Sequence, residues 1–216
     1  IKTNNLIVDI GSNDGTCLKA FKNHGFKVCG VDPAKIPSEI ANQNKIFTIN
    51  KFFSVNVVNE IVERFGQADF ITSQNVLAHI SNPKKIFKNI YNLLKNDGYF
   101  AFEVGYFRDV LEKGCFDTIY HEHLDYHHAK PLSIFLTKMG FEIIEFSTNN
   151  IQGGSLRVLL KKSNNPKISE KAKKFIIDES NSFLFDKVFL KNWASMINSN
   201  MKLLKKTIDQ SISEGK

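Results

Sequence analysis

The densest group of chemically active side chains lies between residues 116 and 128, FDTIYHEHLDYHH. It holds four of the six histidines of the chain, two tyrosines and three carboxylates. A histidine can act as a general base near neutral pH, and a tyrosine beside it can donate a hydrogen bond to a developing oxyanion. Tyr120, Glu122 and His123 are therefore predicted to carry acid–base chemistry, with Glu122 orienting an imidazole or holding a substrate hydroxyl.

The same stretch allows two other interpretations. In the first it is a metal site, in which His121 and His123 supply two ligands and Glu122 or Asp125 a third. In the second it is a polar surface loop, an interpretation that suits the two histidines directly before a predicted helix, as a cap or as solvent-facing side chains: His127 and His128.

A second candidate site begins at the strand 6–10, in which four of the five residues are apolar. Gly11 and Gly15 follow, and then apolar residues at helical spacing. A strand, a glycine turn and a helix present main-chain N–H groups at the helix N-terminus. The next strand, 26–31, ends in Asp32, at about the spacing where a carboxylate binds a ribose diol. Together these features predict an adenosine-type cofactor.

The identity of that cofactor depends on Asn13 and Asp14. Asn13 replaces the glycine that lets a pyrophosphate approach the backbone, and the Asp14 carboxylate would repel a pyrophosphate. S-adenosylmethionine (SAM) has no phosphate and carries a positive sulfonium, so local electrostatics favour it over NAD. A structural turn with no ligand is the remaining interpretation. The predicted cofactor-binding residues are Gly11, Asn13, Asp14, Gly15, Asp32, Pro33, Gln74 and Asn75.

The elements that position these residues alternate between strand and helix. Further strands are predicted at 45–49, 68–73, 99–104, 141–146 and 155–160, and helices at 34–43, 55–65, from 83 and at 130–139, with turns at 96–98 and 149–154. Ligands of such a sheet bind at the carboxyl ends of its strands, so Gln74, Asn75 and Glu103 are expected to line one crevice. Asn75 is equally compatible with a helix cap, and His79 with a core position.

This alternation predicts an α/β fold with a right-handed, parallel, doubly wound sheet. The closing helix, strand, tight reversal and edge strand fit the usual topology of Rossmann-like class I SAM methyltransferases. The sheet is expected to be seven-stranded and mostly parallel, with one antiparallel edge strand. The pattern from 168 to 212 is helical throughout. We therefore assign residues 1–162 to a SAM-binding methyltransferase domain and residues 163–216 to a helical extension. Methyl transfer to a strong nucleophile needs no metal, so none is expected.

Composition excludes several classes of function. The net charge is +7, but residues 161–216 hold 12 of the 29 Lys and Arg and only 6 of the 22 Asp and Glu. This basic tail has no nucleic-acid motif and is expected to be a solvated helix face. No run of apolar residues approaches the length of a membrane span. The three cysteines follow no metal spacing, which indicates reduced thiols in the cytoplasm.

Five stretches resemble the SAM-dependent C-methyltransferases of nucleotide-linked 4-keto-deoxysugars. They are residues 11–16 (GSNDGT), 30–34 (GVDPA), 120–126 (YHEHLDY), 153–157 (GGSLR) and, more weakly, 75–79 (NVLAH). The most specific part is the Tyr-x-Glu-His block together with the later Gly-Gly-Ser-x-Arg.

The resemblance implies a mechanism in which the carbon next to a ketone is methylated. His123 matches the base that removes the proton, Tyr120 the phenol that works with it, and Glu122 a carboxylate that helps to place the substrate. The chemistry agrees, because the enolate formed needs a preorganised hydrogen-bond donor and an aligned methyl group.

The sequence departs from the family at both ends. Family members begin with a cysteine-rich zinc-binding domain and continue into a C-terminal domain, and neither is present here. We therefore expect a central domain whose flanking domains are absent, with the helical tail as a linker. A short relative with a different acceptor is the alternative.

Three competing functions remain. A SAM-dependent O- or N-methyltransferase acting on a sugar or another small metabolite would use the same cofactor residues. An NAD-dependent oxidoreductase is disfavoured by Asn13 and Asp14. A non-catalytic binding module is the third.

Overall fold

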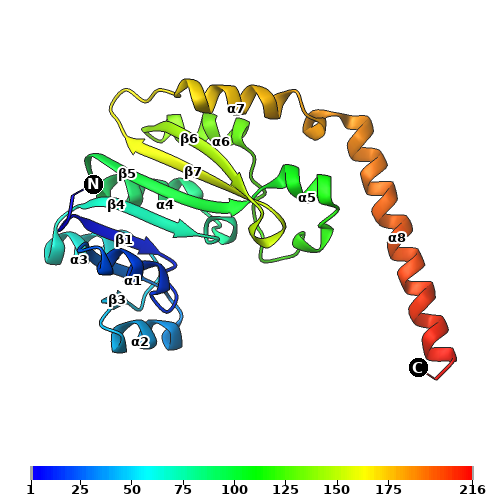
Figure 1. Cartoon of the computed structure of the whole chain (residues 1–216), viewed down its shortest axis with the longest axis horizontal. Helices are drawn as coiled ribbons and strands as arrows, with labels where there is room; N and C mark the ends of the chain where they lie inside the picture. The colour runs from blue at the N-terminus through cyan, green and yellow to red at the C-terminus, as the bar shows by residue number, and fades with distance from the viewer. Residues whose placement is uncertain (1, 216) are drawn as a thin grey trace.

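The computed structural model describes residues 2–215 and contains a seven-stranded sheet in the order β3-β2-β1-β4-β5-β7-β6 (Figure 1). The strands are β1 (Leu6–Ile10), β2 (Lys27–Val31), β3 (Thr48–Ile49), β4 (Ala68–Gln74), β5 (Leu94–Gly105), β6 (Phe141–Asn149) and β7 (Ser155–Lys162). The helices are α1 (Thr16–Asn23), α2 (Lys35–Gln43), α3 (Val55–Phe65), α4 (Pro83–Leu93), α5 (Phe107–Lys113), α6 (Ala129–Lys138), α7 (Glu170–Ser180) and α8 (Lys187–Ser213). Four short 3-10 turns are η1 (Leu77–His79), η2 (Phe116–Thr118), η3 (Ile151–Gly153) and η4 (Phe183–Phe185). The predicted Rossmann-like α/β fold is confirmed.

Strand β1 lies at the centre of the parallel part of the sheet, and all five of its residues are buried. It pairs with β2 and β4, so that Val8 lies opposite Cys29 on one side and Ile71 on the other. Successive side chains point to opposite faces. Ile7 accordingly packs with Leu18 of α1, whereas Val8 belongs to the larger core. Since β1, β2 and β4 run in parallel, their carboxyl ends meet at one edge of the sheet.

The single antiparallel strand is β7, which pairs with both β5 and β6. It was expected at the very edge of the sheet, but it lies one strand in and β6 forms the edge. The reason is that β7 folds back from β6 and pairs along β5 from Tyr99 to Gly105, filling the place between them.

The turn predicted at residues 96–98 is contained within β5 rather than preceding it. Ala68 of β4 pairs with Leu94, and the next pair is Phe70 with Tyr99. The residues of β5 between Leu94 and Tyr99 therefore form an irregular loop that does not pair with β4. Asp97 has a φ of 61° there, the left-handed conformation that a turn requires.

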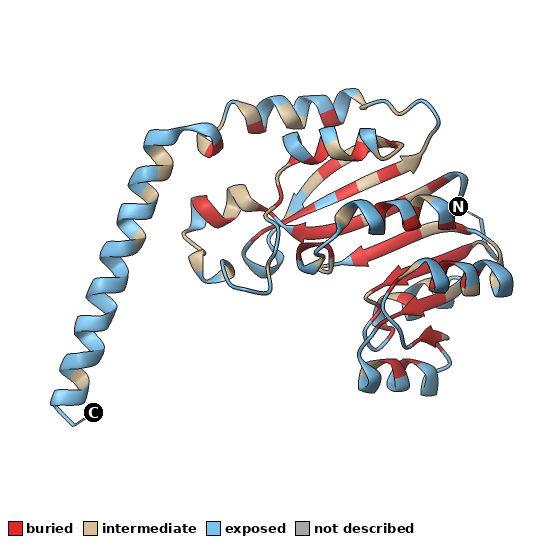
Figure 2. Ribbon diagram, turned by 180° about the vertical axis from the view of Figure 1, so that it is seen from behind, coloured by how far each residue is buried: buried red, intermediate tan, exposed pale blue. Residues whose placement is uncertain are grey.

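The sequence pattern predicts a C-terminal region that is helical throughout. The structure instead has a break between α7 and α8. Asp186 caps α8, since its carboxylate accepts hydrogen bonds from the N–H groups of Val188 and Phe189. Helix α7 packs on β6 and α6, whereas α8 projects from the body of the molecule and is exposed along most of its length (Figure 2). Its contact with the body includes Trp193, whose indole N–H donates to the main-chain oxygen of Leu111 in α5.

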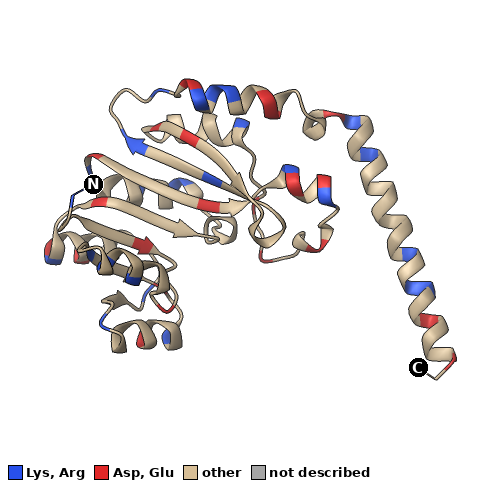
Figure 3. Cartoon of the chain, viewed as in Figure 1, with Lys and Arg blue, Asp and Glu red and all other residues tan. Residues whose placement is uncertain are grey.

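Most of the basic excess of the tail lies on α8, which has five exposed lysines and one aspartate (Figure 3). On α7 three lysines are balanced by three acidic residues. Among residues 2–215, the structure contains no helix with the length and apolarity that a membrane span requires.

Candidate active site and cofactor site

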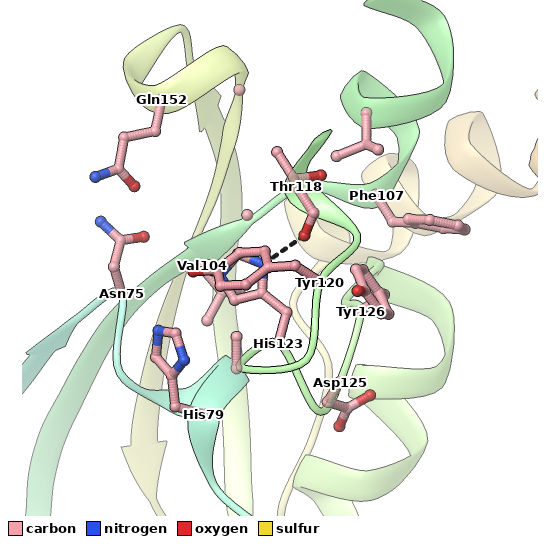
Figure 4. A pocket seen from close by; sticks show the side chains of 14 residues that line it. Asn75, His79, Val104, Phe107, Thr118, Tyr120, His123, Asp125, Tyr126 and Gln152 are labelled. Atoms are coloured by element: carbon pink, nitrogen blue, oxygen red, sulfur yellow. Dashed lines mark hydrogen bonds between the residues drawn. The ribbon is translucent and has the colours of Figure 1, made fainter. Parts of the chain in front are cut away.

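A cavity of about 370 Å³ opens at the carboxyl ends of β4 and β5 (Figure 4). Its lining includes Asn75, His79, Tyr120, His123, Tyr126 and Gln152. These residues come from the segment after β4, from the 116–128 stretch and from the β6–β7 turn. The fold thus brings the predicted chemical cluster to the strand ends, where ligands of this kind of sheet bind.

His123 is held in one orientation by a main-chain contact. Its Nδ1 donates a hydrogen bond of 2.7 Å to the carbonyl oxygen of Thr118. Because that oxygen only accepts, Nδ1 carries a proton, and in the singly protonated ring Nε2 is an acceptor toward which the Tyr120 hydroxyl can donate. Nε2 lies 3.5 Å from the Tyr120 hydroxyl, and the two rings are 4.5 Å apart between centroids. A base and a phenol donor are therefore adjacent in one cavity.

His79 faces the same cavity and is fixed in a similar way. Its Nδ1 lies 2.9 Å from the main-chain oxygen of Glu122, and its ring is 5.0 Å from that of His123. The N–H of Leu124 also donates to the carbonyl of Ala78, which ties the chemical loop to η1. His79 is therefore not a core residue. Its side chain is exposed and lines two neighbouring cavities, as the alternative of a crevice position predicts.

The Glu122 carboxylate does not line this cavity. The side chain is exposed, and it is the main-chain oxygen of Glu122 that contacts His79. The carboxylate that does line the cavity belongs to Asp125.

His128 occupies the N-cap position of α6, but its side chain makes no capping hydrogen bond. Contrary to the expectation of solvent-facing side chains, His127 is buried and His128 is half-buried. His127 is only 9% exposed, and burial lowers the pKa of both imidazoles. The N-terminus of α6 needs no histidine cap, because the Glu179 carboxylate accepts from the N–H groups of Ala129 and Lys130. Within residues 2–215, no three or more His, Cys, Asp or Glu side chains are grouped so that they could hold a metal ion.

A second cavity, of about 380 Å³, lies over the ends of β1 and β2. It is lined by Gly11 and Pro33 from the predicted cofactor set, and also by Phe52, Val76 and His79. Gly11 has a φ of +76°, and a Cβ there would overlap the Val76 side chain. Only glycine suits this bend, because φ is left-handed and the Val76 side chain fills the space that a Cβ would need.

The bend is held by carboxylates. Asp32 accepts from the N–H of Asn13 at 2.9 Å and from that of Ala34 at 2.8 Å. Each of its oxygens keeps a lone pair that a ribose hydroxyl can use. Hydrogen bonds from the hydroxyl and N–H of Thr16 hold the pKa of the Asp14 carboxyl below its usual value. The negative charge at the turn is thus retained, as a cationic ligand requires.

Asp9 is a buried acidic residue that the sequence analysis did not single out, and it lines neither cavity. It is 2% exposed, and one of its carboxylate oxygens has no hydrogen-bond partner among the described residues. Burial, with the charge of Asp32, raises its pKa to about 7. The signal was an acidic residue inside an otherwise apolar strand, since such a group is buried only where something partners it.

The remaining predicted cofactor residues fall into different places. Gln74 is exposed, and its amide donates to the Thr72 hydroxyl. Gly15 has a φ of +80° and packs on Ile46, so it shapes the bend. Asn75 lines the chemical cavity rather than the cofactor cavity, and it does not cap a helix, since η1 follows Val76 without a side-chain cap.

Comparisons with known proteins agree with this geometry. Residues 1–146 match the family model described as "Methyltransferase domain". The chain is 35% identical over 153 residues to C-methyltransferase NovU of Streptomyces niveus, covering 71% of this chain and 36% of that protein. It is 31% identical over 111 residues to a ubiquinone biosynthesis O-methyltransferase of Glaesserella parasuis, covering 45% of each.

A solved structure, magnesium protoporphyrin IX methyltransferase from Synechocystis PCC 6803 with bound SAH, has a similar fold. The TM-score is 0.58 at 13% identity, over 74% of this chain and 75% of that one. The chain spans less than half the length of the two curated relatives named above. At the level of the family, the predictions of a methyltransferase and of SAM as its cofactor are confirmed. The chain belongs to the methyltransferase-domain family, with the fold of SAM-dependent methyltransferases.

Proposed function

We propose that the chain is the SAM-binding domain of a C-methyltransferase that acts next to the ketone of a nucleotide-linked keto-deoxysugar. The observation that carries the proposal is the pairing of His123 with Tyr120 in a cavity that adjoins the glycine-bend cavity. The similarity to a C-methyltransferase over most of the domain supports it. Residues 163–216 are proposed to connect this domain to a further one.

The cofactor is proposed to lie in the second cavity, held by Gly11 and Pro33, which line it, and by Asp32 beside Pro33. When bound, SAM supplies an electrophilic methyl group on a positively charged sulfur. The Asp32 carboxylate, which keeps a free lone pair on each oxygen, would bind the ribose hydroxyls. His79 lines both cavities and so stands at their boundary.

The acid–base step is assigned to His123. Its Nε2 lone pair removes a proton from the carbon next to the ketone, and the Thr118 carbonyl stabilises the imidazolium through Nδ1–H. The Tyr120 hydroxyl donates a hydrogen bond to the enolate oxygen. SAM bound in the second cavity would give its methyl group to the enolate carbon and leave as S-adenosylhomocysteine when the S–CH₃ bond breaks. Orientation of the acceptor in the cavity supplies much of the rate.

Product analysis tests this proposal. The protein is incubated with SAM carrying a ¹³C-labelled methyl group and a nucleoside-diphosphate-linked 4-keto-6-deoxyhexose. We expect a new C–CH₃ signal by NMR, and we expect His123→Ala to abolish it while SAM affinity stays within twofold. An O–CH₃ product would overturn the assignment to carbon.

O-methylation of a small metabolite is the second candidate function. The similarity to ubiquinone biosynthesis O-methyltransferases favours it, and His123 would then deprotonate a hydroxyl. The same labelled experiment with a catechol as acceptor separates the two, because only this candidate gives an O–CH₃ signal.

A further inference from the structure

Two carboxamide side chains face each other in the cavity that holds His123. Asn75 follows β4, Gln152 lies at the β6–β7 turn, and their amide ends point toward one another (Figure 4). Among residues 2–215, no hydrogen bond is recorded for either amide group. Both groups are therefore available to a ligand.

Both residues have left-handed backbones. The φ angle is 55° at Asn75 and 52° at Gln152, a conformation that is unfavourable for most residues other than glycine. Asparagine tolerates it, but glutamine has no such preference, and Gln152 stands directly before Gly153 and Gly154. Strain of this kind is typical of residues that a site holds in place for a ligand.

One residue, Glu103, holds in place the two main-chain segments that carry Asn75 and Gln152. Its main-chain oxygen accepts from the N–H of Asn75 at 2.8 Å. Its carboxylate accepts from the side chain of Asn149 at 2.9 Å, and Asn149 in turn accepts from the N–H of Ile151, where the turn that carries Gln152 begins. Glu103 is 4% exposed and paired with Arg157, so this anchor is rigid.

The chemistry of the pair selects a neutral hydroxylated ligand. A carboxamide both donates and accepts hydrogen bonds, as a hydroxyl group does, whereas a phosphate needs donors and a cation needs acceptors. The residues that line this cavity include no lysine or arginine. We propose that Asn75 and Gln152 bind ring hydroxyl groups of the acceptor and so select a polyhydroxylated ring. This inference rests on the proposed function, because it concerns the acceptor of the same site.

Glycine substitutions test the pair without straining the backbone. Gln152→Gly and Asn75→Gly remove the amides at positions where glycine fits the φ angle. Lys45→Gly is the matched control, because Lys45 is exposed, has a φ of 62° and lines neither cavity.

The measurement is calorimetric titration of the protein, saturated with S-adenosylhomocysteine. The probes are a nucleoside-diphosphate-linked 4-keto-6-deoxyhexose and the same compound without the hydroxyl at carbon 2 or carbon 3. We expect loss of one hydroxyl to weaken binding to the wild type and to the control about tenfold. In the two glycine variants the difference should fall to within twofold, with S-adenosylhomocysteine affinity unchanged.

The outcomes separate this inference from the proposed function. Equal discrimination in the wild type and in Gln152→Gly overturns the amide pair, even when a C–CH₃ product forms. Hydroxyl discrimination that depends on the amides, with an O–CH₃ product, supports the pair and overturns C-methylation. A tenfold loss of S-adenosylhomocysteine affinity in the variants assigns the amides to the donor and overturns the inference. Failure of the wild type to bind any of the three sugars overturns both.

Discussion

The Glu179 carboxylate at the end of α7 accepts a 3.0 Å hydrogen bond from the Tyr106 hydroxyl just after β5. The same carboxylate accepts from the first two N–H groups of α6, those of Ala129 and Lys130, and it is fully buried. Tyr106 stands beside Gly105 and Phe107, which line the cavity of His123. This contact therefore joins the C-terminal helices to the wall of the site.

Removal of Glu179 should be costly. Glu179→Ala leaves three donors without a buried acceptor, so we expect the free energy of unfolding to fall by about 3–5 kcal/mol in urea denaturation. Asp178→Ala is the matched control, because Asp178 is exposed and its ion pair with Arg108 should contribute less than about 1 kcal/mol. Equal losses for the two variants would refute the role of the buried carboxylate.

Much of the fold could be predicted because it depends on local periodicity. The bounds of β1 and α3 coincide with the predicted ranges 6–10 and 55–65. The apolar pattern of these segments matches a buried strand and an amphipathic helix, and tertiary packing does not override it. The gathering of the 116–128 stretch at the strand ends also followed from the topology.

The predictions that were wrong concern features that depend on contacts between residues far apart in the sequence. Nothing local shows that Glu179, 50 residues away, accepts from the first N–H groups of α6, so that the His128 side chain at the N-cap position is not needed for capping. Strand β7 lies between β5 and β6 because it pairs with β5, a long-range pairing that the apolar pattern of the sequence cannot reveal. The break before α8 had a local signal in the cap Asp186, but the apolar spacing on both sides masked it.

Asp9 should make stability depend on pH. Its pKa in the folded protein is raised from 3.8 to about 7. Below pH 4 the carboxyl is protonated in both states and does not lower the free energy of unfolding, which then falls as the pH rises toward 7. Asp9→Asn removes this penalty. We expect the variant to gain about 2–4 kcal/mol over the cofactor-free wild type above pH 7, and little at pH 4.

Urea denaturation of both proteins from pH 4 to 8.5 measures that difference. Asp97→Asn serves as the control, since Asp97 is exposed and should show a difference that is flat within about 0.5 kcal/mol. A flat difference for Asp9→Asn as well would mean that Asp9 is not a strained buried carboxyl.

The glycine bend should tolerate no side chain. Gly11→Ala places a methyl group on the Val76 side chain at a left-handed position, and we expect a loss of about 2–4 kcal/mol in stability and at least tenfold in SAM affinity. Gly66→Ala has the same sign of φ but nothing within 4 Å, so it should cost only about 1 kcal/mol and leave SAM binding intact. Calorimetry and thermal denaturation compare the two, and unchanged SAM affinity in Gly11→Ala would argue against the cofactor site.

The claim at the centre of the account is that His123 removes a proton from the carbon next to a ketone. Its most direct test is proton exchange in D₂O, with S-adenosylhomocysteine in place of the donor and the keto-sugar nucleotide as substrate. We expect the wild type to incorporate deuterium at that carbon, detected by NMR, and His123→Gln to slow this exchange at least 100-fold with S-adenosylhomocysteine affinity unchanged. Exchange at the wild-type rate in His123→Gln, or methylation by a wild type that shows no exchange, would contradict the account.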